Sequence, residues 1–228
     1  MSAYEAVCFD LDRTLCVGTQ DPESVLADAF DRAGCDPFCT YESLRELVPA
    51  VSSAETDHQF HVNLFEHAAH RQSVDPSIAP ALAESYLECY DPTAVRLRDG
   101  GAEILQHARD RASAVGLITN GGPALQMQKL EALDIDDVFD VTVFVDPEAG
   151  IPPKPDPRPF ERALGAVDVE PDHALHVGDA HYADVVGANA VGMDSAWLAA
   201  YDATPDAFER TAEPTYELAS LSGLSSLL

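Results

Sequence analysis

Two aspartates lie one residue apart near the start of the chain, at the end of a short apolar run. The segment FDLDRTL, residues 9–15, directly follows Ala6-Val7-Cys8. A buried carboxylate is costly unless a cation or a hydrogen-bond donor compensates its charge. Asp10 and Asp12 therefore indicate a site at which carboxylates do chemistry, rather than two acids left at the end of a buried strand.

Polar residues follow three later apolar runs in the same way. Thr119 and Asn120 follow the second run, Lys154 lies in a loop after the third, and Asp179 follows the fourth, with Asp184 five residues further on. The carboxyl ends of parallel strands meet at one edge of a sheet, so we expect these groups to converge there. Several acids, a lysine and a hydroxyl suit a divalent cation and a phosphoryl group, and oxygen-rich sites of this kind favour Mg²⁺.

Simpler roles exist for three of these residues. An aspartate such as Asp184 also serves as a helix cap or turn residue, and Thr119 could be a turn threonine. Lys154 could be a surface lysine. A purely structural role is least compatible with Asp10 and Asp12, because two unpaired buried carboxylates are expensive.

Apolar runs alternate with helix-like segments over most of the chain. The predicted strands are Ala6–Phe9, Ala114–Thr119, Val141–Val145, Ala174–Val177, Met193–Leu198 and Tyr216–Ala219. The predicted helices are Ala102–Arg111, Pro123–Leu133, Pro159–Leu164 and Ala183–Ala190, with a last helical turn from Leu221. Short strands that are apolar on both faces and alternate with helices predict an α/β fold, in which a doubly wound, Rossmann-like parallel sheet is covered on both faces.

The region after the first strand breaks this alternation. It shows no convincing strand, and its patterns predict helices at 22–33, 41–48, 56–71 and 78–90. A block of this length is too long for a loop. We therefore predict an inserted, all-helical cap domain at 18–91, and a core domain formed by 1–17 and 92–228.

The charge balance is strongly acidic. Forty acidic residues against thirteen lysines and arginines give a formal net charge of −27, and only Lys129 and Lys154 are lysines. Such a field repels nucleic acid and anionic membranes, so neither is expected as a partner. The acids are spread along the chain, which predicts a halophilic protein from a high-salt cytoplasm; an ordinary acidic enzyme is the alternative.

Cysteine usage and the N-terminal residues point to the cytoplasm. The five cysteines contain no CxxC pair, which argues against a disulfide framework or a zinc knuckle and favours reduced, apolar use. The first residues, MSAYEAV, lack the basic region followed by an apolar region that is typical of a signal peptide. No apolar run approaches the length of a membrane span.

The order DLDRT, ITN, KPDP and GDAHYAD resembles the four motifs of the haloacid dehalogenase-like (HAD) hydrolase superfamily. The helical insert after the first motif resembles the cap of its phosphoglycolate phosphatase and haloacid dehalogenase branch. The match covers nearly the whole chain. Each motif is short, so the resemblance depends on four occurring in order, each after a predicted strand. Position 13 is arginine where the family often has glycine, and position 180 is alanine where a small hydroxyl residue is common.

The resemblance implies a role for each candidate residue. Asp10 would be the nucleophile that forms an aspartyl-phosphate, and Asp12 the general acid and base. Thr119, Lys154 and the backbone N–H of Asn120 would bind the phosphate oxygens. A set of four residues would hold Mg²⁺: Asp10, Asp12 through its carbonyl, Asp179, and Asp184 directly or through water.

The identity of single residues distinguishes the related reactions of this superfamily. Haloacid dehalogenases lack the second acid of the first motif, so Asp12 favours phosphoryl transfer. Phosphonate hydrolases use a cap lysine, and residues 1–128 contain none. The missing cap lysine also weakens the prediction of a phosphomutase, without excluding it. We therefore expect a Mg²⁺-dependent phosphatase acting on a small phosphate ester. A 2-haloacid dehalogenase, a phosphomutase or a non-catalytic phospho-ligand-binding protein are the alternatives.

Several features remain open at this level. Arg13 could meet a substrate anion or pair with a surface acid, and the latter is slightly favoured. Thr14 is expected to make a local hydrogen bond in its turn. The predicted cap helix carries four histidines, His58, His61, His67 and His70, which we interpret as a solvated polar face rather than a zinc site. The substrate and the oligomeric state are not determined by the sequence.

Overall fold

The computed structural model describes residues 4–51, 54–201 and 211–228. It divides into two compact units. The core unit comprises Met1–Val17 and Arg96–Leu228, and the inserted unit comprises Gly18–Val95.

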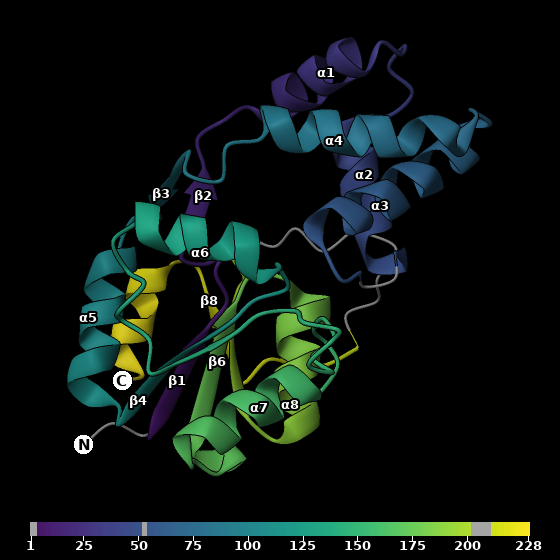
Figure 1. The fold of residues 1–228 in the computed structure, drawn as a ribbon. Coiled ribbons are helices and arrows are strands. Elements are labelled where there is room, and N and C mark those ends of the chain that lie inside the picture. Colours follow the sequence, from purple (N-terminus) through teal and green to yellow (C-terminus); the bar gives the residue numbers. More distant parts are fainter. Residues whose placement is uncertain (1–3, 52–53, 202–210) are drawn as a thin grey trace. The chain divides into compact units, whose positions relative to one another are not determined.

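The core unit is built on a six-stranded parallel sheet. Its strands are β1 (Ala6–Phe9), β4 (Ala114–Ile118), β5 (Val141–Val143), β6 (Ala174–Gly178), β7 (Asp194–Leu198) and β8 (Tyr216–Leu218). Their order is β5-β4-β1-β6-β7-β8, and each neighbouring pair is parallel. β1 lies inside the sheet with β4 and β6 on either side, as Figure 1 shows. This confirms the predicted α/β fold with a doubly wound parallel sheet.

Side chains of successive strand residues enter two different hydrophobic clusters. In β1, Val7 and Phe9 belong to one cluster, whereas Ala6 and Cys8 belong to the other. This division follows from the two-residue period of a strand, and it explains why the strands read as continuous apolar runs.

Helices cover both faces of the sheet. The first cluster receives residues from α5 (Gly101–Arg111), from α6 (Pro123–Ala132) and from the 3₁₀ turn at Leu221–Ser226. The second receives residues from α7 (Arg158–Val167) and α8 (Val186–Val191). Figure 1 shows α5 on one side of the sheet and α7 with α8 on the other.

The last predicted helix of the core differs from the sequence expectation. The pattern predicts a helix at 183–190, but α8 begins only at Val186 and is preceded by a π-helical turn at His181–Val185. Asp184 lies within this wide turn, where its Oδ2 accepts a hydrogen bond from the backbone N–H of Ala180 at 3.0 Å. The turn thus places a buried acidic side chain where a regular helix was expected.

Two short strands were not predicted. β2 (Cys16–Gly18) and β3 (Val95–Leu97) form a separate two-stranded sheet where the chain enters and leaves the inserted unit. Three residues are too few to show an alternation that sequence reasoning could recognise.

The inserted unit contains four α-helices in its described residues, 18–51 and 54–95. They are α1 (Pro22–Ala33), α2 (Tyr41–Leu47), α3 (Asp57–Gln72) and α4 (Ala79–Cys89). Asp21, Thr40 and Thr56 each cap a helix by accepting a hydrogen bond from a backbone N–H three residues ahead. The helices enclose their own hydrophobic cluster, whose largest members include Phe30, Phe65 and Leu82.

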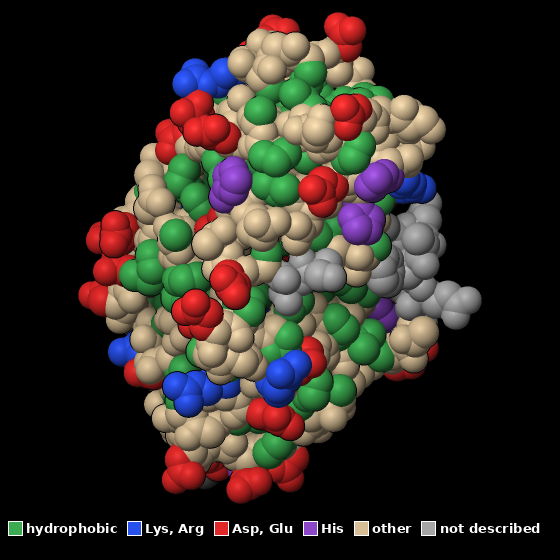
Figure 2. Space-filling view, turned by 45° about the vertical axis from the view of Figure 1, so that its right-hand side comes forward, with side chains coloured by type: hydrophobic (Ala, Val, Ile, Leu, Met, Phe, Trp, Pro, Cys, Tyr) green, Lys and Arg blue, Asp and Glu red, His purple; other side chains and the backbone are tan. Residues whose placement is uncertain are grey.

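The molecular surface carries acidic side chains in many places. Figure 2 shows them scattered over the face that it draws, without one dominant patch. Among the described residues, no helix combines the length and the hydropathy that crossing a bilayer requires. Cys8 and Cys16 lie buried in the two clusters of the core unit, as their predicted apolar use implies.

Candidate active site

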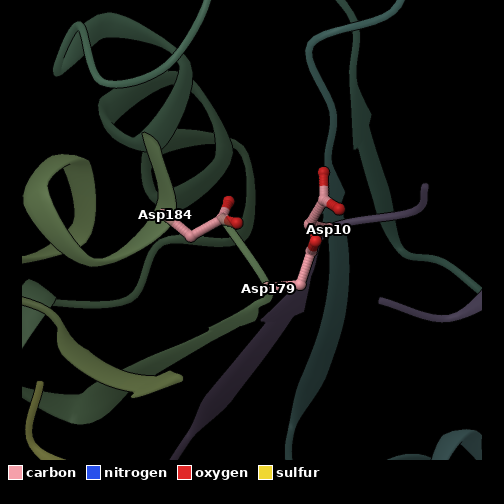
Figure 3. Close-up of side chains that lie close together, drawn as sticks. All are labelled: Asp10, Asp179 and Asp184. Atoms are coloured by element: carbon pink, nitrogen blue, oxygen red, sulfur yellow. The ribbon is translucent and has the colours of Figure 1, made fainter. Parts of the chain in front are cut away.

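Three buried aspartates meet at the carboxyl edge of the core sheet. Asp10 follows β1, Asp179 follows β6, and Asp184 comes from the π-helical turn. One carboxylate oxygen from each lies within 4.8 Å of the others. Figure 3 shows the three side chains directed toward a common space. The structure therefore brings together three of the four residues predicted to hold a metal ion.

Lys154 is buried beside this cluster. Its Nζ lies 2.8 Å from Oδ1 of Asp10 and 2.7 Å from Oδ1 of Asp184, and it also donates to the carbonyl of Ile118 at 2.7 Å. Burial alone would lower the pKa of this lysine, but the two carboxylates outweigh burial and raise it. Lys154 is therefore a fixed positive charge within the site and not a surface lysine.

The three carboxylates differ in their electrostatics. Burial raises the pKa of Asp10 to about 6, although Lys154 opposes the shift. Burial, followed by the charges of Asp10 and Asp184, raises the pKa of Asp179 to about 8. Burial would also raise the pKa of Asp184, but Lys154 and a hydrogen bond from His176 lower it to about 2.

This donor set fits a divalent cation. Lys154 contacts two of the three clustered carboxyl groups and Arg13 contacts the third, that of Asp179, yet burial with the charges of Asp10 and Asp184 still raises the pKa of Asp179 to about 8. A bound Mg²⁺ would supply further positive charge, and carboxylate oxygens are the ligands it prefers. Asp10, Asp179 and Asp184 are the side chains that would hold it.

Asp12 lies in different surroundings from Asp10. Its side chain is 46% exposed, and Lys129 Nζ contacts its two oxygens at 2.7 and 2.9 Å. Gln126 donates to Oδ2 of Asp12 at 2.8 Å. Sequence reasoning missed both partners, although their three-residue spacing on a helix that follows Thr119 was a usable signal.

The second and third motifs are joined by hydrogen bonds. Thr119 is buried, and its Oγ1 accepts from Gln126 at 2.7 Å. The side chain of Asn120 accepts from the backbone N–H of Lys154 at 2.7 Å and donates to its carbonyl at 3.0 Å. The side chain of Asn120 thus holds the loop that carries Lys154. Only the backbone N–H of Asn120 is predicted to contribute to phosphate binding.

Arg13 and Thr14 both contact Asp179, which corrects two expectations. The hydroxyl of Thr14 is fully buried and donates to Oδ1 of Asp179 at 3.3 Å, so its hydrogen bond is long-range and not local. Arg13 Nε lies 3.5 Å from Oδ2 of Asp179, which is a buried acid and not the surface acid favoured from the sequence. Both contacts join the segment after β1 to the residue after β6, and local sequence patterns do not encode such long-range contacts.

His176 is a further buried neighbour that the sequence did not single out. It lies on β6, its Nε2 is 3.0 Å from Oδ1 of Asp184, and burial lowers its pKa. A neutral imidazole can donate from Nε2, which orients the aspartate. Gly178, two residues further on, leaves room for this arrangement, because a Cβ there would lie 2.2 Å from Cγ of Asp184.

The histidines of α3 do not gather into a metal site. Among the described residues, the three aspartates of the core form the only such cluster of acids, cysteines and histidines. His58, His67 and His70 are exposed, as a solvated polar face requires. His61 instead packs against Phe60 and Tyr86.

Comparison with known proteins identifies the family. The family model for haloacid dehalogenase-like hydrolases matches residues 4–192. The chain is 32% identical to the glyceraldehyde 3-phosphate phosphatase of Pyrococcus abyssi, over 85% of this chain and 81% of the relative. It is 31% identical to the pyrimidine 5'-nucleotidase YjjG of Escherichia coli, over 99% of this chain and 98% of the relative.

A solved structure shows the same fold. A predicted phosphoglycolate phosphatase from Haemophilus somnus superposes with a TM-score of 0.79 at 18% identity, and the match covers 100% of this chain and 99% of that one. The ordered motifs, the site at the sheet edge and the relatives agree, and the chain belongs to the haloacid dehalogenase-like hydrolases, among relatives that are phosphatases.

Proposed function

We propose that this protein is a Mg²⁺-dependent phosphatase that hydrolyses a small phosphorylated metabolite through an aspartyl-phosphate on Asp10. One observation carries the proposal: three carboxylates and a buried lysine meet at the carboxyl edge of a parallel sheet. The phosphatase relatives support the same reaction class.

Each residue has a role that its surroundings allow. Asp10 attacks phosphorus, so that a bond from its carboxylate oxygen forms as the bond to the leaving oxygen breaks. Asp12, which is partly exposed, gives a proton to the leaving oxygen and then accepts one from the hydrolytic water. Thr119, the backbone N–H of Asn120 and Lys154 hold the non-bridging oxygens. Mg²⁺, when bound, offsets the repulsion between the anionic nucleophile and the anionic substrate.

The inserted unit is proposed to act as the cap that selects the substrate and excludes bulk water. We keep the predicted boundaries, with 18–91 as cap and 1–17 with 92–228 as core. The two relatives are named for different substrates, glyceraldehyde 3-phosphate and pyrimidine 5'-nucleotides. We therefore propose small phosphate monoesters as the substrate class.

A substrate screen tests the function. Phosphate release would be measured from p-nitrophenyl phosphate and from a panel containing phosphoglycolate, sugar phosphates and nucleotides, with MgCl₂ or with EDTA. We expect turnover that EDTA removes and that Asp10→Asn reduces to background. Equal rates for wild type and Asp10→Asn on every phosphate would reject the enzyme and favour a phospho-ligand-binding protein.

A further inference from the structure

One face of α6 contacts the acid of the first motif that would transfer protons. We infer that Gln126 and Lys129 are positioning residues, which hold the carboxyl group of Asp12 in line with the leaving oxygen. The inference rests on the proposed phosphatase function, and it adds two residues that lie outside the four motifs.

Lys129 binds Asp12 through both carboxylate oxygens. Its Nζ is 2.7 Å from Oδ1 and 2.9 Å from Oδ2. The lysine side chain is only 8% exposed, whereas that of Asp12 is 46% exposed. A buried group that contacts both oxygens restricts rotation of the carboxyl group about its bond to Cβ. The partner is thus rigid, while the acid keeps access to a substrate.

Gln126 connects Asp12 to the phosphate-binding hydroxyl. Its Nε2 donates to Oδ2 of Asp12 at 2.8 Å and to Oγ1 of Thr119 at 2.7 Å. An amide nitrogen has two protons, and these contacts use both. Because Oγ1 of Thr119 accepts here, its own proton is directed to another acceptor, as binding a phosphate oxygen requires. A single amide therefore sets the relative placement of the two groups.

The carbonyl oxygen of the Gln126 amide lacks a hydrogen-bond partner within the described part of the chain, so this arrangement lowers the stability of the folded protein. Oε1 of Gln126 is buried and has no hydrogen-bond partner among the described residues. A buried acceptor without a hydrogen-bond partner destabilises the folded protein, because it loses its bonds to water on folding. Rotating the amide would not relieve it, because the carboxylate of Asp12 requires a donor on that side. Stability alone does not explain a glutamine at this position.

The local backbone is shaped to hold this side chain. A Cβ on Gly121 would lie 2.5 Å from Cδ and Nε2 of Gln126, so the amide packs directly against the glycine. The lysine is also unusual in this chain. Lys129 and Lys154 are its only lysines, and each one donates to a candidate catalytic carboxylate.

Leaving-group dependence distinguishes positioning from a general structural role. Protonation by Asp12 matters for an alkoxide leaving group and much less for p-nitrophenolate, which leaves without a proton. Lys129→Met should therefore lower kcat/KM for an alkyl phosphate by about 10- to 100-fold, a part of the ~10²- to 10⁴-fold that acid–base catalysis contributes, because Asp12 itself remains. For Lys129→Met the loss with p-nitrophenyl phosphate should be about threefold or less, because that leaving group needs no proton from Asp12. Gln126→Leu should show the same preferential loss on the alkyl phosphate, together with a loss shared by both substrates, because its amide also contacts the hydroxyl of Thr119.

Asp12→Asn supplies the reference for these variants. It should show the same leaving-group pattern, and adding Lys129→Met to it should cause little further loss, because residues that act as one unit are not additive. Gln128→Leu, on the exposed face of the same helix, is the control and should leave kcat/KM unchanged.

Two results would overturn the inference. One is an equal loss of kcat/KM on the alkyl phosphate and on p-nitrophenyl phosphate in Lys129→Met and Gln126→Leu. The other is a loss of kcat/KM in these variants that adds fully to the loss caused by Asp12→Asn. An inactive wild type would instead reject the proposed function itself, and the inference with it. Melting temperatures of all variants identify any that fail to fold, and either single variant suffices for the comparison.

Discussion

Trp197 donates its indole N–H to the backbone carbonyl of Asp179 at 3.0 Å. It is the single tryptophan of the chain, and it lies on β7 beside the strand that delivers Asp179. The intrinsic tryptophan fluorescence of the protein therefore originates next to the candidate metal site.

This contact predicts a direct signal for metal binding. Titration with MgCl₂ should produce a saturable change in tryptophan emission, because a cation on Asp179 alters the field at the indole. Asp179→Asn should weaken or abolish the response. If Mg²⁺ raises the melting temperature but leaves the emission unchanged, the ion binds elsewhere.

Removing Lys154 should destabilise the core strongly. Lys154→Met leaves Asp10 and Asp184 buried without their shared cation, and breaking a buried pair in this way costs about 3–5 kcal/mol. Urea unfolding at pH 7 would measure the change in the free energy of unfolding, and added MgCl₂ should recover part of it by supplying positive charge.

A matched control uses an exposed ion pair. Arg32 and Glu88 have side chains that are 58% and 48% exposed, so Arg32→Gln should cost no more than about 1 kcal/mol. A loss for Lys154→Met as small as for this control would mean that the buried charges are compensated by other groups.

Magnesium affinity should increase with pH. Burial, with Asp10 and Asp184, raises the pKa of Asp179 to about 8, and a protonated carboxyl group must release its proton before it binds a cation. Affinity should therefore be low at pH 6 and should level off above about pH 8, where the proton is already gone.

The same shift affects the metal-free protein. The folded state keeps a proton that an unfolded aspartate releases near its usual pKa of 3.8, so the contribution of Asp179 to stability falls as pH rises toward about 8. Calorimetry at several pH values, in buffers with different ionisation enthalpies, measures both affinity and proton release. Asp179→Asn should bind more weakly and without this pH dependence; an unchanged wild-type affinity from pH 6 to 8.5 would contradict the assignment.

Two glycines should respond oppositely to alanine. A Cβ on Gly178 would lie 2.2 Å from Cγ of Asp184, so Gly178→Ala must displace a candidate ligand and should weaken both Mg²⁺ binding and activity. Gly165, on α7, has nothing within 4 Å of its added Cβ, and Gly165→Ala should stabilise the protein by about 0.5–1 kcal/mol. Retained Mg²⁺ affinity in Gly178→Ala would show that Asp184 is not needed in its present position.

The halophilic character remains a prediction from the net charge of −27. At molar KCl the screening length is about 3 Å, so repulsion between dispersed carboxylates should largely vanish. Melting with EDTA present, in low salt and in molar KCl, would separate this effect from magnesium binding. Greater stability in low salt would indicate an ordinary acidic enzyme.

The parallel sheet, and the edge at which the candidate site residues lie, are both predictable from the sequence. Both depend on local information: short runs apolar on both faces predict buried parallel strands, and a polar residue after each run must lie at the common carboxyl edge. Asp10, Thr119, Lys154 and Asp179 could be named for this reason.

Which groups each of these residues contacts depends instead on how the elements pack in three dimensions. Asp12 bonds to Gln126 and Lys129, which lie 114 and 117 residues further along the chain, and Thr14 bonds to Asp179 across 165 residues. A sequence pattern reports the period and the ends of an element, but not which rotamers meet when elements pack. The candidate acid–base residue, the candidate metal ligands and their hydrogen-bond partners therefore meet only because packing brings the separate strand ends to one edge of the sheet.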